Sequence, residues 1–152
     1  MRASLILCDS SAQDMGGGKV HMLGAGWSMI GPEPAPHAVV AFIKVGWTEA
    51  NEPHKLVLRL TDGDGNVVSL PGPTSAVPME FSGSLEVGRP PGVPQGSDID
   101  ATFALNLGPL PLAPGHRYRW ILEINSEELA SEGFYVRRPL PPPPQPGASA
   151  QP

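Results

Sequence analysis

The stretch T-D-G-D-G-N-V-V contains the residues of this chain whose spacing most resembles a chemical site. Asp62, Asp64 and Asn66 alternate as the first three oxygen ligands of a calcium-binding loop do. Such a loop needs glycine at its sixth position and glutamate at its twelfth, which here are Val67 and Pro73. Aspartate, glycine and asparagine are also the residues that tight turns favour. The sequence therefore predicts a turn between two strands, and these three residues are its only metal candidates.

Two glycine-rich stretches resemble nucleotide-binding loops only in part. M-G-G-G-K-V lacks the first glycine of a phosphate-binding loop, and a valine instead of Ser or Thr follows Lys19. G-A-G-W-S-M lacks the third glycine of a dinucleotide fingerprint and the helix that should follow it. Its glycines indicate a bulge or a close approach of the backbone to a neighbour. The sequence therefore predicts no cofactor.

Residues that could act in catalysis are present but scattered. The four histidines form no H-x-x-x-H or H-x-H pair, and no G-x-S-x-G stretch supplies a serine nucleophile. Cys8 lies in an apolar alternation, where a free cysteine behaves as a small apolar residue. We therefore predict a non-catalytic chain. An enzyme whose site assembles from scattered residues is kept as an alternative, since such sites are recognised by geometry and not by order.

The three tryptophans suggest a second alternative, a carbohydrate-binding module. Trp27 and Trp47 end predicted strands and could present their rings to a ligand or a partner. Trp120 is in phase with Tyr118 and Leu122, so we expect it in the core.

The composition of the 152 residues limits the partners. The net charge is -5, the pI is near 5.2, and Lys and Arg form no long cluster, so we expect neither nucleic acid nor a membrane surface as partner. With 40% apolar residues the chain can bury a core. The remaining class is a protein partner or self-association.

The predicted compartment is the cytoplasm. Cys8 is the only cysteine, which fits a reducing environment because no internal disulfide can form. The N-terminal apolar run, residues 5–7, is shorter than the apolar part of a signal peptide. No stretch is long enough to span a bilayer.

Apolar and polar residues alternate along most of the chain, which predicts about nine short strands separated by turns. The expected fold is an all-β, immunoglobulin-like antiparallel sandwich. In that order of strands the predictions are B at 37–46, C at 54–62, C′ at 66–70, D at 78–87, E at 98–107, F at 116–125 and G at 133–138. The one expected helical turn is S-E-E-L-A, residues 126–130.

A local motif carries the sandwich prediction. L-A-P-G-H-R-Y, ending at Tyr118, resembles the tyrosine corner of immunoglobulin-like and fibronectin-like domains. In such a corner the tyrosine hydroxyl bonds to backbone a few residues upstream.

The chain divides into a sandwich domain, residues 1–138, and a Pro-rich tail, residues 139–152. The tail, P-L-P-P-P-P-Q-P-G-A-S-A-Q-P, has too few apolar side chains to build a core, so we expect polyproline II and disorder. Arg138 and the prolines after it match a ligand of SH3-type grooves, and a spacer is the other interpretation.

Four stretches together resemble a family of small uncharacterised actinobacterial proteins. They are A-x-L-x-L-x-D from Ala3 to Asp9, G-K-x-x-x-L-G-x-G-W from Gly18 to Trp27, V-G-R-P-P-G, and L-G-P-L-P-L-A-P-G. The resemblance covers nearly the whole domain and not the tail. It implies no catalytic or binding residue, because no activity is established for that family. We therefore predict a non-catalytic interaction or accessory module.

Overall fold

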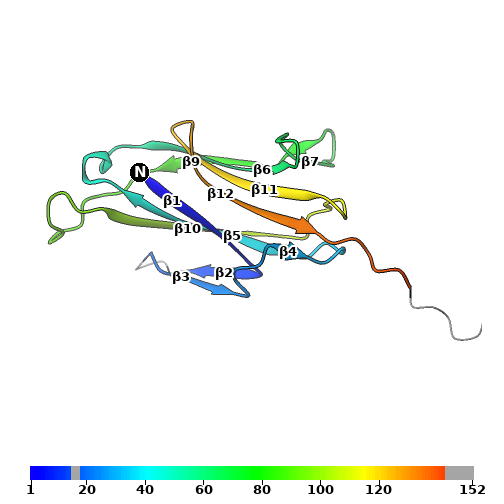
Figure 1. Cartoon of the computed structure of the whole chain (residues 1–152). Coiled ribbons are helices and arrows are strands. Elements are labelled where there is room, and N and C mark those ends of the chain that lie inside the picture. Colours follow the sequence, from blue (N-terminus) through cyan, green and yellow to red (C-terminus); the bar gives the residue numbers. More distant parts are fainter. Residues whose placement is uncertain (15–17, 143–152) are drawn as a thin grey trace, which may run out of the picture.

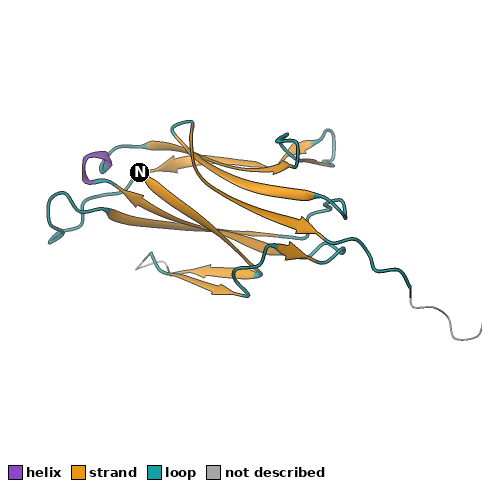
Figure 2. Ribbon diagram, viewed as in Figure 1, coloured by secondary structure: helices purple, strands orange, loops and turns teal. Residues whose placement is uncertain are grey.

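The alternating stretches of the sequence are strands in the computed structural model, which describes residues 1–14 and 18–142 (Figure 1, Figure 2). Two sheets face each other. The three-stranded sheet has the order β1 (Arg2–Cys8), β5 (His37–Val45) and β10 (Ile99–Leu107). The five-stranded sheet has the order β4 (Met29–Ile30), β12 (Glu127–Val136), β11 (Arg117–Ile124), β6 (His54–Asp62) and β9 (Glu80–Leu85).

All neighbouring strands of the two sheets are antiparallel, except that β4 runs parallel to β12. This order is that of an immunoglobulin-like sandwich in which the first strand region contributes to both sheets. The predicted fold class is therefore confirmed. Two short hairpins complete the strands: β2 (Ser10–Gln13) with β3 (Val20–Leu23), and β7 (Ser69–Leu70) with β8 (Val77–Pro78). A single turn of 3₁₀ helix, Trp47–Glu49, follows β5.

The core lies between the two sheets, and Trp120 is its largest fully buried side chain. On β11, residues 118, 120, 122 and 124 are buried, whereas 117 and 119 are exposed and 121 and 123 are half-buried. The predicted phase of this strand is therefore confirmed. Because side chains alternate between the faces of a strand, the burial of Trp120 fixes which residues of β11 face solvent.

Tyr118 forms the predicted corner. Its hydroxyl accepts a hydrogen bond of 2.9 Å from the backbone N–H of Ala113, five residues upstream. Its ring packs on Phe134 of β12, with 5.8 Å between the ring centroids. The bond ties the loop before β11 to the strand, as the sequence motif predicts.

His37, at the start of β5, lies in the same aromatic cluster and is 2% exposed. The indole Nε1 of Trp120 donates to His37 Nε2 at 3.3 Å, so this nitrogen carries no proton. Trp27 and Phe134 contact the imidazole with centroid distances of 5.8 and 5.9 Å. Burial lowers the pKa of His37, because a charged imidazolium loses its hydration there, and a backbone interaction with Ala35 acts in the opposite direction.

The hairpin β2–β3 covers part of the outer face of the three-stranded sheet. Val20 and Met22 of β3 pack against Cys8, Ala38 and Val40, so Cys8 is fully buried as predicted. In the G-A-G-W stretch, Gly24 has φ +62°, and a Cβ there would lie 2.1 Å from the Asp9 carboxylate. The expected close approach is confirmed at this glycine.

Residues 126–130 do not form the predicted helical turn. Asn125 and Ser126 have φ of +52° and +69°, which makes a two-residue hairpin, and β12 starts at Glu127. The glutamates favour a helix, but a stretch of five residues cannot offset the cost of helix nucleation. Pairing with β11 therefore determines the conformation, and strand G begins six residues earlier than predicted.

The strand at 78–87 is not strand D. Residues 80–85 form β9, which pairs with β6 and so occupies the C′ position of the five-stranded sheet. Residues 66–70, predicted as C′, contribute only β7 to the small hairpin β7–β8. The backbone N–H of Met79 donates to Val68 and its carbonyl accepts from Leu60, so the chain returns directly beside β6.

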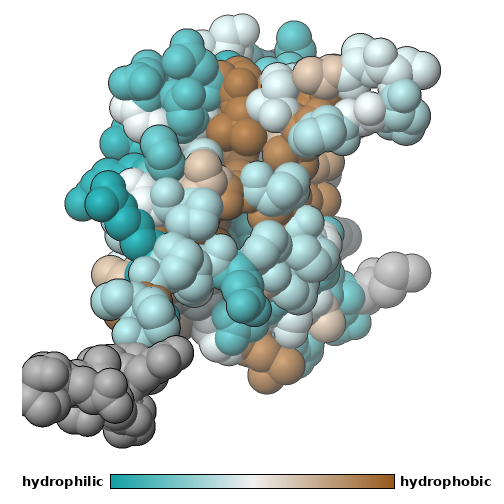
Figure 3. All heavy atoms as spheres, turned by 90° about the vertical axis from the view of Figure 1, so that its right-hand side faces the viewer, coloured by the Kyte–Doolittle hydropathy of each residue, from teal (hydrophilic) through white to brown (hydrophobic). Residues whose placement is uncertain are grey.

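The remaining surface carries few large apolar side chains. Val67, Val77 and Phe81 are 36–49% exposed and belong to the region of β7–β9. Figure 3 views the right-hand end of Figure 1, and apolar side chains gather in its upper half. None of the described residues belongs to a helix with the length and apolar character needed to cross a bilayer. Of the predicted tail, residues 143–152 lie outside the described residues.

Replacement of Trp120 by alanine should lower the free energy of unfolding by about 3–5 kcal/mol, because a large core ring is lost. Tyr118→Phe removes one hydroxyl and should cost about 1 kcal/mol. Urea unfolding followed by fluorescence and circular dichroism measures both changes. A Trp120→Ala variant as stable as the wild type would show that the phase of β11 is wrong.

Acidification below pH 6.5 should destabilise the fold through His37. The unfolded chain protonates this histidine near its ordinary pKa of about 6.5, whereas the folded protein keeps it neutral. The unfolded state then binds more protons, so the free energy of unfolding falls with decreasing pH, by up to about 1.4 kcal/mol per unit. Urea melts at pH 7.5, 6.5 and 5.5 measure this slope.

The matched control for this pH effect is His37→Gln, which keeps an acceptor for the Trp120 indole but does not titrate. Its stability should change less over the same range. Equal slopes for the two proteins would exclude His37 as the origin of the effect.

Candidate functional site

The D-G-D-G-N stretch forms a turn whose first carboxylate is used by the turn itself. Asp62 ends β6, and its Oδ1 accepts from the backbone N–H groups of Asp64 at 3.0 Å and Asn66 at 2.9 Å. Asn66 also donates from its side chain to Asp62 Oδ2 at 3.4 Å. These bonds, led by the backbone N–H of Asn66, lower the pKa of Asp62. Asp62 and Asn66 thus stabilise the turn, and Thr61 and Val67 pair across it.

Beside this turn the outer face of the five-stranded sheet is hollowed. The cavity has a volume of about 450 Å³ and is open to solvent. We call it the arginine hollow and define it by the lining residues Thr61, Asp62, Asp64, Arg117, Arg119 and Gly133. The structure therefore brings two of the metal candidates next to two guanidinium groups that are distant in the sequence.

Strand register places each side chain of the arginine hollow. Arg117 and Arg119 are two residues apart on β11 and so share its outer face. Arg119 lies between Thr61 of β6 and Gly133 of β12. Gly133 has no side chain, so the position beside Arg119 stays open and the backbone forms the floor.

The two arginines carry positive charge without a carboxylate partner. Arg117 lies over the ring of Tyr135, 5.9 Å from its centroid. Across the described ranges 1–14 and 18–142, neither guanidinium forms an ion pair. Two guanidiniums can bind a carboxylate or phosphate by charge-assisted hydrogen bonds. The same charges oppose a cation at Asp62 and Asp64.

Along the rest of this outer face the charge of the side chains changes sign from one end of the strands to the other. Ile121, half-buried, follows Arg119 on the same face and pairs with Ser131. Next along β11, Glu123 forms a two-pronged ion pair with Arg59 of β6. Glu128 of β12 lies opposite Glu123 and is exposed. One end of the face is therefore basic and the other acidic.

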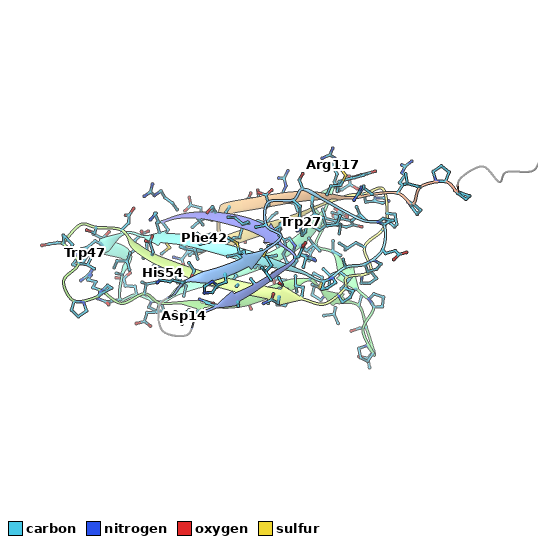
Figure 4. The ribbon with its side chains drawn as sticks, turned by 90° about the horizontal axis from the view of Figure 1, so that it is seen from below. Asp14, Trp27, Phe42, Trp47, His54 and Arg117 are labelled. Atoms are coloured by element: carbon cyan, nitrogen blue, oxygen red, sulfur yellow. The ribbon has the colours of Figure 1, made fainter. Side chains whose placement is uncertain are left out.

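Trp27 and Trp47 do not come together. Trp27 packs against His37 at the start of β5, whereas Trp47 follows the end of that strand, and Figure 4 shows the two residues far apart along the molecule. A nine-residue strand spans about 25–30 Å. Both rings are half-buried, and Arg89 lies over Trp47 with 5.0 Å to the ring centroid. The two rings therefore cannot form one carbohydrate platform.

A second groove, of about 520 Å³, lies on the outer face of the three-stranded sheet and includes Phe42 and Thr102 in its lining. Its charged residues are neutralised by neighbours. Lys44 forms an ion pair with Asp100 at 2.5 Å, and Arg2 pairs with Asp98 at 2.5 Å. This groove offers an apolar floor without a free charge.

The scattered residues that could act in catalysis have structural environments. Burial, together with the charge of Asp9, raises the pKa of Cys8 and disfavours the thiolate. His54 is buried and its ring nitrogens contact the carbonyl of Glu49 and the amide of Asn125. No three His, Cys, Asp or Glu side chains among the described residues lie close enough together to hold a metal ion.

Sequence reasoning missed Arg117, Arg119 and Gly133. The alternation R-Y-R-W was visible and gave the phase of β11, which already implies two arginines on the solvent side. The hollow itself depends on the register between β11 and β12, since only that register sets a glycine beside Arg119. The pattern of residues within one strand does not indicate how that strand is aligned with its neighbour.

The chain belongs to DUF6941, a family of unknown function, whose profile matches residues 3–137. The resemblance to an uncharacterised family over nearly the whole domain is thus confirmed, and the actinobacterial source stays a prediction. A search among curated proteins gives no match.

Several solved structures are similar to this chain at low identity. One is a Pseudomonas fluorescens alkylpurine DNA glycosylase, AlkC, bound to DNA containing an abasic site analog, with TM-score 0.42, 13% identity, and coverage of 73% of this chain and 28% of that one. A second is a beta-glucuronidase from glycoside hydrolase family 2, with TM-score 0.36, 18% identity, and coverage of 68% and 10%. A third is a glycosyl hydrolase family 2 member from Bacteroides cellulosilyticus DSM 14838, with TM-score 0.34, 12% identity, and coverage of 68% and 12%. The chain thus spans less than a third of each of these proteins, and likeness at this level does not bear on function.

Calcium and chelators should leave the melting temperature unchanged, because Asp62 bonds to its own turn and two guanidiniums lie beside it. Differential scanning fluorimetry with excess EDTA and with excess calcium measures this. Asp64→Asn, which removes the free carboxylate of the turn, is the comparison variant and should respond in the same way. A fall of several degrees in EDTA that calcium reverses would establish a structural metal site.

Proposed function

We propose that this chain is a non-catalytic interaction module that binds a protein partner through the outer face of its five-stranded sheet. In this proposal an acidic side chain of the partner enters the arginine hollow. The observation that carries it is the pair of guanidiniums, Arg117 and Arg119, around a glycine floor; within the part of the chain that the structure describes, neither forms an ion pair with a carboxylate. In a chain of net charge -5, such a local concentration of positive charge selects an acidic contact.

The form of the face supports a protein partner. On the β12 side of Ile121 the residues of this face are small, Ser131 and Gly133, and on the β6 side Ile121 pairs with Arg59, whose guanidinium is held by Glu123. An apolar centre with a charged rim is the usual anatomy of a protein interface. The rim charges would govern the association rate and its dependence on salt.

The two alternatives receive less support from the geometry. A carbohydrate platform would need aromatic rings close together, and Trp27 and Trp47 are far apart along the molecule. An enzyme would need titratable groups converging on a cleft. Cys8, His37 and His54 are buried and line neither of the two cavities described above. Buried Tyr118 borders the arginine hollow, and its hydroxyl is engaged in the corner bond to Ala113. The proposal places the module in the cytoplasm, which the single cysteine supports.

The test is a capture experiment from a lysate of the native host with matched variants. Arg117→Glu/Arg119→Glu should lose a partner that the wild type retains, because both contacts become repulsive. Arg2→Glu changes a charge on the opposite sheet and should retain the partner. Circular dichroism melts verify that all three proteins are folded.

Two further measurements sharpen this test. Raising the ionic strength should weaken capture by the wild type, since exposed charges are screened beyond about 8–10 Å at physiological salt. The acidic segment of the captured partner, prepared as a peptide, should compete for binding. A partner that binds the double variant as well as the wild type would refute the role of the arginine hollow.

A further inference from the structure

The outer face of the five-stranded sheet carries two arginines and two glutamates on opposite sides of one residue, Ile121. Ile121 pairs with Ser131 near the middle of the face. Two residues before it, Arg119 pairs with Gly133, and two residues after it, Glu123 pairs with Glu128. The hollow and the exposed carboxylate of Glu128 therefore lie on opposite sides of Ile121, each two residues away along β11. On β12 a register shift at Leu122/Glu123 puts Glu128 three residues from Ser131, whereas Gly133 is two residues from it.

This arrangement of charges defines a partner of the same shape. Consider two copies whose five-stranded sheets face each other, related by a two-fold axis that lies midway between the sheets and passes over Ile121. If this axis is perpendicular to the strands, each strand of one copy lies over the same strand of the other, and the two strands run in opposite directions. This packing would place Glu128 of a second copy above Gly133, and Glu123 of that copy above Arg119. Each such contact would occur twice, as in any isologous pair.

We propose that a second copy of this chain occupies this face, with Glu128 of each copy inserted into the arginine hollow of the other. The proposal rests on the proposed function, because the same hollow receives the carboxylate, and it names the partner. Arg117 and Arg119 would bind Glu128 with charge-assisted hydrogen bonds, and Ile121 would pack against its symmetry mate. Glu123 would approach Arg119 while its pairing with Arg59 neutralises much of its charge.

The geometry of each copy suits this contact. The hollow of about 450 Å³ is larger than a glutamate side chain needs, and Gly133 leaves its centre free. Glu128 is exposed on an edge of the sheet beyond the reach of β4, which pairs with β12 only at Tyr135 and Val136. Between them, β11 contributes Ile121 and β12 contributes Ser131. On β6, Arg59 pairs with Ile121 and would face its own symmetry mate, with its charge offset by the two-pronged ion pair to Glu123.

The size of the face indicates a weak dimer. Four strands about 4.8 Å apart and about 25 Å long give a face of roughly 500 Å². Stable complexes bury about 800 Å² on each partner. We therefore expect association that depends on concentration and weakens with added salt.

The test is a charge exchange followed by analytical ultracentrifugation of the full chain. The wild type should change from monomer to dimer as its concentration rises. Arg119→Glu and Glu128→Arg should each raise the dissociation constant at least about tenfold, because each creates like charges facing across the interface. A mixture of the two variants should associate more tightly than either variant alone, because the two exchanged side chains then face each other with opposite charges and the unchanged Glu128 meets an unchanged arginine hollow.

Two controls separate this contact from general charge effects. Glu127→Arg changes the next residue of β12, which pairs with the buried Ile124 and so points to the other side, and it should leave the dissociation constant unchanged. Arg2→Glu alters a charge on the other sheet and should also leave the dissociation constant unchanged. Thermal melts confirm that each variant is folded.

The outcomes also separate this inference from the proposed function. A wild type that stays monomeric at every concentration, or a mixture that fails to associate, overturns the second copy as partner. In that case the loss of a lysate partner by Arg117→Glu/Arg119→Glu would still support the interaction module. Dimerisation that the single exchanges abolish and the mixture restores supports the inference.

Discussion

The burial of Trp120 between the two sheets is the constraint on which the rest of the structure depends. An indole buried in a core needs a partner for its N–H group, and His37 of the opposite sheet accepts it. This bond joins β11 to β5 and requires that His37 stay neutral. Since strand residues alternate between faces, burial of Trp120 obliges Arg119 and Ile121 to face solvent. The proposed binding face is thus a direct consequence of core packing.

Sequence reasoning succeeded for features that depend on residues within one strand and the turn before it. The alternation around Trp120 gave the phase of β11, and the Pro-Gly turn before Tyr118 gave the corner that ties this strand to its loop. Both features depend on residues close together in the chain. The sandwich class followed from the number of such strands, and their register played no part in that prediction.

Sequence reasoning failed for segments whose conformation depends on pairing with a strand that is distant in the sequence. Residues 126–130 have a local preference for helix, but a partner strand supplies more backbone hydrogen bonds than one helical turn can. β9 joined the five-stranded sheet because Met79 returns the chain beside β6, which no alternation in residues 78–87 can indicate. The arginine hollow belongs to the same class, since it exists only where Gly133 is in register with Arg119.

The net charge of -5 describes the whole surface and hides its local structure. Four of the seven arginines, at positions 117, 119, 137 and 138, lie on β11 or directly after β12. The exclusion of nucleic acid as partner stays a prediction. It is compatible with this cluster, because a nucleic-acid backbone is bound by a longer basic track, whereas the acidic Glu123 and Glu128 share this face.

The edges of the sheets favour association through the face over strand addition. On β10, the Gln13 side chain donates to the Thr102 carbonyl, and Asn106 exchanges two hydrogen bonds with the backbone of Ser11, so part of this strand is already covered by β2. On β9, two copies pairing antiparallel about Gly83 would set Glu80 opposite Glu86, and like charges opposite each other destabilise such a pair. Charges of this kind are how edge strands avoid joining. On the face around Ile121, the two-fold axis between facing sheets would instead set Glu123 over Arg119 and Glu128 over the arginine hollow, while Arg59, paired with Glu123, would face its own mate. Opposite charges at both ends of the face therefore favour a second copy there more than at the β9 edge.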